Sequence, residues 1–290
     1  MSKHLVKQIQ RQVELYVSKF NLKSLIIGVS GGLDSGLNCA LLKPVCDKLK
    51  IPLIGRYIHI ETNKEDEKKR AEKIGKMFCH DFKSVDLTPL YLDSKTIMEE
   101  TRPHDDDDKT VKIRRGNIKA RLRMIYLYNL ASEFGGIVVD NDNQTEHLLG
   151  FWTISGDVGD ITPLFKLFKT EVYELAKYYV STLSTDEERE ALQLVIDAVP
   201  TDGLGITSSD VEQFGVHSYA EVDEILQAYL NGYMTNRDIK EALEKKYSVD
   251  IINKIIERHV KSDFKRHHPH RLILTLNREK WWENKEKGLE

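Results

Sequence analysis

The chain has 290 residues, of which 40% are hydrophobic and 31% are charged, and its formal net charge is −3. This composition is typical of a soluble globular protein that is long enough for one large α/β domain with a helical extension, or for two domains. The slightly negative charge gives no general attraction to nucleic acid, and no apolar run approaches the about 20 residues that a membrane-spanning helix needs.

Helical and strand-like hydrophobic patterns alternate through the first half of the chain. The helix predicted over 3–20 has one apolar stripe, formed by Leu5, Ile9, Val13 and Val17. Strands are predicted over 24–29, 53–60, 82–86 and 137–140, and further helices over 35–49, 64–79, 88–99 and 116–134. This alternation predicts an α/β fold with a doubly wound, mostly parallel sheet flanked by helices, whose core spans about 22–180.

Loops and helices make up the second half. Residues 100–115 include four consecutive aspartates, Asp105–Asp108, and we expect a solvated surface loop with the length of a lid. After a loop rich in glycine and aspartate over 150–168, helices are predicted over 169–182, 185–196, 219–230, 236–245 and 249–260, followed by a basic tail. We expect a single domain over 1–290 whose C-terminal portion, about 185–290, is helical.

The three cysteines, Cys39, Cys46 and Cys79, fall on two of the predicted helices. They lack the spacing of metal ligands, so we expect buried thiols in a reducing cytoplasm.

The segment after the first strand has the composition of an anion-binding turn. Residues 28–35 read Gly-Val-Ser-Gly-Gly-Leu-Asp-Ser, so a glycine turn leads from a strand to a helix N-terminus, where free N–H groups attract phosphate. Gly31 and Gly32 allow a sharp turn and a close approach of the backbone to the phosphate. An aspartate beside phosphate requires a cation between them, so we interpret Asp34 as a Mg²⁺ ligand. The alternative is an ordinary glycine turn of an α/β domain.

Two further segments place polar groups beside the predicted sheet. The helix over 116–134 opens with three basic side chains, which fit either an anion site or a plain solvated face. The strand over 137–140 delivers Asn141 and then Glu146 to the carboxyl edge of the sheet, where ligands gather in open parallel sheets. Glu146 fits either a metal ligand or a charge that stabilises a helix start.

The turn over 28–35 resembles the pyrophosphate loop of the N-type ATP pyrophosphatases, and four later segments resemble NAD synthetase. These segments are Arg115–Met124 (RGNxxARxRM), Glu146–Thr153 (ExxxGFxT), Gly156–Lys166 and Val199–Leu204 (PTxxL). The third is similar to the family's GDxxxDxxPL segment, but Val158-Gly159 makes it one residue shorter. The resemblance spans roughly residues 5–266 and keeps the family's order. It implies an adenine nucleotide alpha hydrolase-like fold.

The resemblance also implies an activity. The pyrophosphate loop begins near residue 28, which leaves no room before it for the amidase domain of glutamine-dependent enzymes, so the ammonia-dependent form is expected. In that form deamido-NAD, ATP and ammonia give NAD, AMP and diphosphate through an adenylated deamido-NAD, with Mg²⁺ as cofactor. A cytoplasmic homodimer that binds its substrate across the dimer interface is expected, with no nucleic-acid or membrane partner.

Individual roles follow from the matched positions. Asp34 and Lys169 would be catalytic, and Asp34 and Glu146 would hold Mg²⁺. ATP would be bound by Gly28, Val29, Ser30, Gly31, Gly32, Leu33, Asp34, Ser35, Asn141, Lys169 and Thr201. Deamido-NAD would be bound by Arg121, Ile154, Asp160, Phe264 and Lys265.

Three positions depart from the family pattern. Asn141 replaces a threonine that contacts ATP, Ile154 stands where a substrate-binding lysine is usual, and Phe264 replaces a histidine. Because the acceptor half is altered more than the ATP half, a second hypothesis is another adenylating amide ligase with a different carboxylate acceptor. A third is a non-catalytic nucleotide-binding protein, which the retention of Asp34 and Glu146 argues against. A tRNA-modifying thiolase is disfavoured because the chain has no paired CxxC.

Overall fold

A computed structural model of the chain describes residues 2–61, 64–98, 108–156, 158–198, 211–273 and 278. The strands are β1 (Leu25–Gly28), β2 (Leu53–His59), β3 (Asp81–Asp86) and β4 (Ile137–Val139). The first eight helices are α1 (Ser2–Lys19), α2 (Leu33–Leu49), α3 (Glu65–Phe78), α4 (Thr88–Met98), α5 (Lys109–Glu133), α6 (Gln144–Leu149), α7 (Lys169–Val180) and α8 (Asp186–Ile196). The later ones are the 3₁₀ helix η1 (Glu212–Phe214), α9 (Tyr219–Leu230), α10 (Arg237–Glu244), α11 (Val249–Lys261) and α12 (Asp263–Arg266).

The four strands form one parallel sheet in the order β3-β2-β1-β4, which confirms the predicted α/β fold. The chain leaves β1 toward β2 on one side and returns to β4 on the other side, so the strand order reverses at β1. In open parallel sheets such a switch point opens a crevice beyond the carboxyl ends of the two strands. The crevice between β1 and β4 is therefore where this topology places a ligand.

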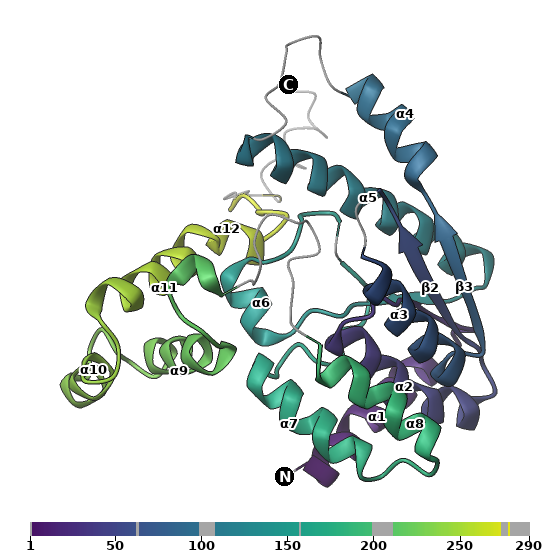
Figure 1. The fold of residues 1–290 in the computed structure, drawn as a ribbon, viewed down its shortest axis with the longest axis horizontal. Helices are drawn as coiled ribbons and strands as arrows, with labels where there is room; N and C mark the ends of the chain where they lie inside the picture. Colours follow the sequence, from purple (N-terminus) through teal and green to yellow (C-terminus); the bar gives the residue numbers. More distant parts are fainter. Residues whose placement is uncertain are drawn as a thin grey trace.

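Helices cover both faces of the sheet (Figure 1). Leu25 and Ile27 of β1 belong to the core shared with α1, α2, α3, α7 and α8, whereas Ile26 packs with α5 on the opposite face. This alternation follows from the two-residue period of a strand, and the continuous apolar run of β1 is what a strand buried on both faces requires. The sheet is therefore doubly wound, as predicted.

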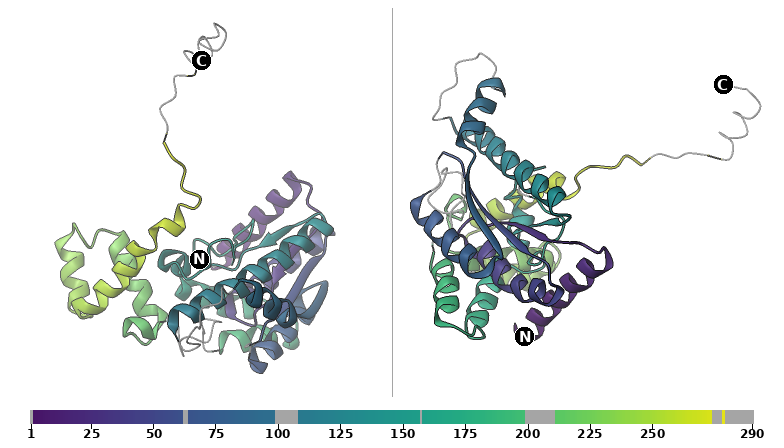
Figure 2. Two further views of the ribbon diagram at one scale, coloured as in Figure 1. Left: turned by 90° about the horizontal axis from the view of Figure 1, so that it is seen from above. Right: turned by 90° about the vertical axis from the view of Figure 1, so that its right-hand side faces the viewer.

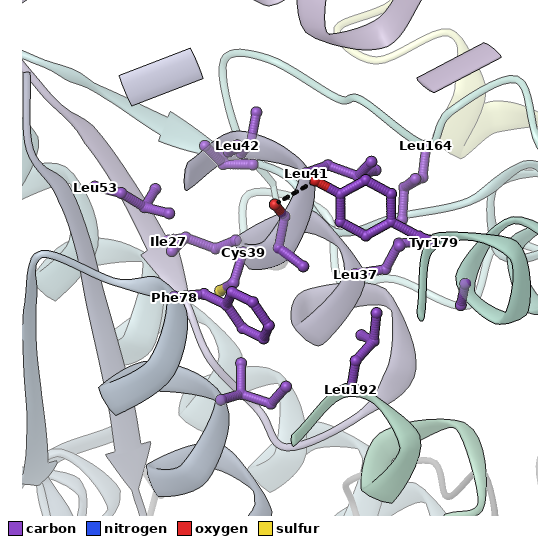
Figure 3. Packing of buried hydrophobic residues seen from close by; sticks show 14 of the residues in the cluster. Ile27, Leu37, Cys39, Leu41, Leu42, Leu53, Phe78, Leu164, Tyr179 and Leu192 are labelled. Atoms are coloured by element: carbon purple, nitrogen blue, oxygen red, sulfur yellow. Dashed lines mark hydrogen bonds between the residues drawn. The ribbon is translucent and has the colours of Figure 1, made fainter. Parts of the chain in front are cut away.

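The larger core surrounds α2, which packs directly against the sheet (Figure 3). Figure 3 shows side chains of the sheet, α2, α3, α7 and α8 meeting there, among them Ile27, Leu37, Phe78 and Leu192. The Tyr179 hydroxyl of α7 donates a hydrogen bond to the carbonyl oxygen of Ala40 in α2, 3.1 Å away. Most of the side chains of α2 are buried in this core, which fixes the position of the helix. The glycine turn lies at the N-terminus of α2 and is therefore held in place with it.

The last four helices form a separate helical lobe, α9 to α12, with a core of its own (Figures 1 and 2). This core also includes Leu148 and Leu149 of α6, so the short helix α6 joins the lobe to the sheet layers. No helix in the described part of the chain is both long enough and apolar enough to cross a membrane.

One predicted loop was wrong in part, and some short helices were missed. The loop expected over 100–115 is helical from Lys109, because Asp108 caps the N-terminus of α5 by accepting a hydrogen bond from the Thr110 N–H at 2.6 Å; residues 100–107 lie outside the described residues. Helix α6 was not predicted, since its six residues are too few for a helical period to be recognised. The short elements η1 and α12 were also not predicted, and the other strands and helices lie within a few residues of their predicted positions.

Candidate active site

The glycine turn after β1 has the geometry of an anion site. Gly31 has a φ of +82°, and a Cβ there would lie 2.2 Å from the carbonyl oxygen of Glu67 in α3, so only glycine fits. Gly32 is the N-cap of α2, and no described side chain caps that helix. The first-turn N–H groups of α2 therefore face the crevice with the positive end of the helix dipole, which favours a phosphate.

The side chains of the turn hold its shape. The Ser35 hydroxyl donates to the carbonyl oxygen of Gly32 at 3.1 Å and accepts from the Ser30 N–H at 3.2 Å. Arg70 of α3 donates from Nε to the carbonyl oxygen of Gly31 at 2.9 Å. The turn is thus braced from within and from α3, so its backbone donors are oriented before any ligand arrives.

Two carboxylates and one ammonium meet at three helix N-termini beside this turn. Lys169, the first residue of α7, donates from Nζ to Oδ2 of Asp34 in α2 and to Oε1 of Glu146 in α6, the latter at 3.1 Å. The Lys169 side chain is 6% exposed, and those of Asp34 and Glu146 are 14% and 19% exposed. The sequence places these residues up to 135 positions apart, and the fold brings them into direct contact.

Asn143 is a site residue that the sequence analysis missed. It is fully buried, its Nδ2 donates to Oδ1 of Asp34 at 2.9 Å, and its Oδ1 accepts from the Glu146 N–H at 3.1 Å. Asn143 and Glu146 form a capping box at the start of α6. The N-x-x-E spacing is the signal that could have identified both the helix and the residue that orients Asp34.

Burial and mutual contact shift the pKa values of this cluster. Burial raises the pKa of Glu146 to about 7, with the nearby Asp34 charge acting in the same direction and Lys169 opposing it. Burial alone would lower the pKa of Lys169, but the carboxylates of Asp34 and Glu146 outweigh it and hold that pKa well above its usual range. The cluster thus keeps a permanent cation between two acidic groups.

This shift predicts a pH dependence for the protein kept free of divalent cations by a chelator. The pKa of Glu146 rises from 4.5 to about 7 on folding, so the folded protein binds the extra proton. The resulting stability is fully present below about pH 4.5 and is lost as the pH rises through about 7. We expect the melting temperature of the wild type, relative to that of Glu146→Gln, to fall between about pH 5 and about pH 8. A difference that stays constant over this range would contradict the assignment.

The cluster opens into a cavity of about 800 Å³ at the carboxyl edge of β1 and β4. Of the predicted ATP and metal residues, Gly28, Val29, Ser30, Gly32, Leu33, Asp34, Ser35, Asn141, Glu146 and Lys169 line it. Gly31 forms the turn behind them, and Thr201 lies outside the described residues. Asn141 also braces the crevice, because its Nδ2 donates to the carbonyl oxygen of Gly28 at 3.0 Å.

Three residues of the cavity lining each have one buried polar atom with no hydrogen-bond partner among the residues that the structure describes. These atoms are Nε of Arg56, the hydroxyl of Tyr57 and Nε1 of Trp152. Burial raises the pKa of Tyr57 to about 12, so its hydroxyl keeps its proton and can donate. Such buried donors without acceptors are costly.

The predicted acceptor residues fall into two groups. Phe264 and Lys265 line the cavity, and Lys265 Nζ donates to the carbonyl oxygen of Gly150 at 2.7 Å. Arg121 and Ile154 contact each other outside it, where Arg121 donates to the Ile154 carbonyl oxygen at 3.2 Å. Asp160 also lies outside the cavity lining, and its carboxylate accepts from the Val138 N–H at 2.9 Å. One chain therefore does not bring all five residues together.

Asp34 and Glu146 have the donor chemistry for a divalent cation. Oxygen-only ligands suit Mg²⁺, which proteins often hold through one or two carboxylates together with the phosphates of a substrate. The described residues contain no group of three or more His, Cys, Asp or Glu side chains placed to bind a metal ion. A site of two carboxylates that a nucleotide completes fits both observations, and the Lys169 ammonium already marks a cation position there.

Comparisons with known proteins show what this chain is similar to. Residues 5–269 match the family model described as NAD synthase. An NH3-dependent NAD+ synthetase of Thermoplasma acidophilum is 31% identical over 268 residues, which are 92% of this chain and 98% of that protein. Among solved structures, an NMN synthetase from Francisella tularensis has a TM-score of 0.71 at 26% identity, covering 96% of this chain and 99% of that one. An NH3-dependent NAD synthetase from Campylobacter jejuni, in complex with the nitrate ion, shares the fold with a TM-score of 0.71 at 21% identity, covering 94% and 100%.

Proposed function

Because this chain belongs to the NAD synthase family, we propose that it amidates deamido-NAD with ammonia in a reaction driven by ATP. It is a ligase, and its products are NAD, AMP and diphosphate. A carboxylate does not react with ammonia in water, because its oxygen is a poor leaving group. Adenylation by ATP replaces that oxygen with AMP, which leaves readily when ammonia attacks.

The observation that carries this proposal is the convergence of Lys169, Asp34 and Glu146 beside an uncapped helix N-terminus. The N–H groups of the glycine turn and the Lys169 ammonium supply positive charge where the diphosphate of ATP would lie. Attack on the α-phosphorus is a transfer that needs positioning and charge neutralisation more than covalent chemistry from the protein.

We assign Asp34 and Glu146 as the residues that would hold Mg²⁺. When bound there, Mg²⁺ would neutralise charge on the phosphates of ATP. Asn143 keeps the Asp34 carboxylate in place, and the capping box keeps Glu146 in place, so both groups are oriented in advance. Lys169 lies between them and can turn its ammonium toward the phosphates once another cation shares the carboxylates.

A cytoplasmic homodimer with the acceptor bound across its interface completes the proposal. Arg121, Ile154 and Asp160 lie outside the cavity lining of one chain, and an acceptor held between two copies would extend beyond that cavity toward them. Ile125 on α5 is 58% exposed, which fits an apolar contact there. Light scattering coupled to gel filtration tests the dimer: we expect twice the mass of 33.5 kDa, and a monomer at micromolar concentration would contradict it.

Product analysis tests the activity directly. We expect that purified protein with ATP, Mg²⁺, an ammonium salt and deamido-NAD releases AMP, diphosphate and NAD in equal amounts. Omission of deamido-NAD should stop AMP release, because adenylation needs the acceptor carboxylate. Binding of ATP without AMP release, whatever carboxylate is added, would instead make the chain a non-catalytic nucleotide-binding protein.

A second acceptor is favoured by one specific observation. The NMN synthetase of Francisella tularensis is similar over 96% of this chain, and Ile154 and Phe264 alter the acceptor side. The corresponding substrate is nicotinic acid mononucleotide, which has the same pyridine carboxylate but lacks the adenylate half. Measurement of kcat/KM for the two acceptors under the same conditions decides between them. A higher kcat/KM for the mononucleotide would identify it, and not deamido-NAD, as the substrate.

A further inference from the structure

A buried carboxylate of the helical lobe lies against the site without touching the cavity. Asp223 on α9 is 1% exposed and is absent from the cavity lining. Its Oδ1 accepts from the Thr145 hydroxyl at 2.5 Å, and its Oδ2 accepts from the N–H and the hydroxyl of Thr170 at 2.9 and 2.8 Å. One side chain thus binds α6 and α7 at the same time.

The two threonines that bind Asp223 are sequence neighbours of Glu146 and Lys169, two residues of the charged cluster at the site. Thr145 precedes Glu146, and Thr170 follows Lys169. The Thr145 hydroxyl oxygen also accepts from the Lys169 N–H at 2.9 Å, so Asp223 and Thr145 together satisfy the first two N–H groups of α7. Helix N-termini need such acceptors, and a negative charge there is favourable.

The same face of α9 contacts the Lys169 side chain. Tyr219 lies one turn before Asp223, and its ring centroid is 5.5 Å from the Lys169 ammonium. Helix α9 therefore supports both ends of Lys169, its backbone N–H through Thr145 and its ammonium through an aromatic face. The core of the helical lobe contains residues of α9 together with two residues of α6. This shared packing holds α9 in place against the site.

We propose that Asp223 is a positioning residue that fixes Lys169 and Glu146 relative to each other, and so couples the helical lobe to the nucleotide site. This inference rests on the proposed function for what Lys169 and Glu146 contact. An asparagine at this position offers one acceptor oxygen and a donor NH2 in place of two acceptor oxygens, so at least one of the three hydrogen bonds is lost. Glu146 and Lys169 then lose their common anchor, although neither side chain has been changed.

Three variants and a matched control test this role. Asp223→Asn removes the charge, Thr145→Val removes the linking hydroxyl at constant size, and Thr145→Ser restores a hydroxyl. The control is Glu224→Gln, which removes a charge from the adjacent residue of the same helix, where Glu224 pairs with Lys246 on the lobe surface. Calorimetry measures binding of the uncleavable ATP analogue AMPCPP with Mg²⁺, at a temperature where circular dichroism shows that each variant is folded.

We expect Asp223→Asn and Thr145→Val to weaken AMPCPP binding by about 10- to 100-fold, as loss of an orienting partner does at other sites. Their KM for ATP should rise while their KM for ammonia stays unchanged, which a general loss of stability would not produce. Thr145→Ser and Glu224→Gln should bind like the wild type, and the two disruptive changes combined should not add.

Wild-type binding by folded Asp223→Asn, or an equal loss in Glu224→Gln, would overturn the inference. If Asp223→Asn does not fold, the comparison of Thr145→Val with Thr145→Ser decides, and equal binding by those two overturns it. A wild type that binds AMPCPP yet forms no amide would refute the proposed function alone, since the binding comparison still stands. A wild type that does not bind AMPCPP would overturn both.

Discussion

We expect that replacing Asp34 by alanine abolishes diphosphate release from ATP while the protein stays folded. The change removes one of the two carboxylates assigned to Mg²⁺, at the position where the proposed function places the phosphates of ATP beside α2. We expect the rate to fall at least about 10³-fold, the upper range for loss of one well-placed electrostatic group. The fold survives because Lys169 keeps its ion pair with Glu146, so the buried cation is not left alone.

A coupled assay for diphosphate measures the rate, and thermal unfolding followed by circular dichroism measures stability. The matched control is Asp47→Asn on the same helix, where Asp47 is half exposed and pairs with Lys43 and His80. The control should keep wild-type turnover. Full turnover by Asp34→Ala would remove the metal assignment.

Replacing Lys169 by methionine has the second largest effect. The change removes the ammonium between Asp34 and Glu146 and leaves two carboxylates, both less than 20% exposed, without their shared cation. Breaking a buried pair in this way costs about 3–5 kcal/mol of the free energy of unfolding. We expect turnover to fall about 10²- to 10³-fold as well, because the cation that faces the phosphates is lost.

The metal dependence of stability distinguishes this account from a simple packing defect. Mg²⁺ without nucleotide should raise the melting temperature of Lys169→Met more than that of the wild type, since the cation position is then open. Lys177→Met, an exposed change on the same helix, should respond to Mg²⁺ like the wild type. An equal response of all three proteins would show that Lys169 does not occupy a cation site.

The glycine turn and its helix could be predicted because their signals are local. The strand–glycine–helix pattern lies within eight residues and predicts a sharp turn at Gly31, which has a φ of +82° in the structure. The alternating helices and strands likewise predict a parallel sheet. In such a sheet the ligand site is expected at the carboxyl ends of the strands. The amino-acid sequence alone was therefore enough to place Asp34 and Glu146 at one edge of that sheet.

Asp223 and Asn143 could not be found in the same way. The partners of Asp223 lie 53 and 78 positions away, and an acidic residue on an amphipathic helix is ordinarily solvated. Asn143 caps a helix of only six residues, and its contact with Asp34 spans 109 positions. The start of α5 was missed for a related reason. Its first turns carry mostly exposed charged residues, so they lack the apolar stripe by which a helix is recognised in a sequence.

The central claim is that the acceptor carboxylate attacks the α-phosphorus of ATP, and an isotope experiment tests it most directly. Deamido-NAD labelled with oxygen-18 in its carboxylate is converted by the wild-type protein with ATP, Mg²⁺ and ammonia, and the products are analysed by mass spectrometry. The account predicts one labelled oxygen in each AMP and none in diphosphate. Release of ADP with the label in inorganic phosphate would contradict it, because the carboxylate would then have been activated at the terminal phosphate instead.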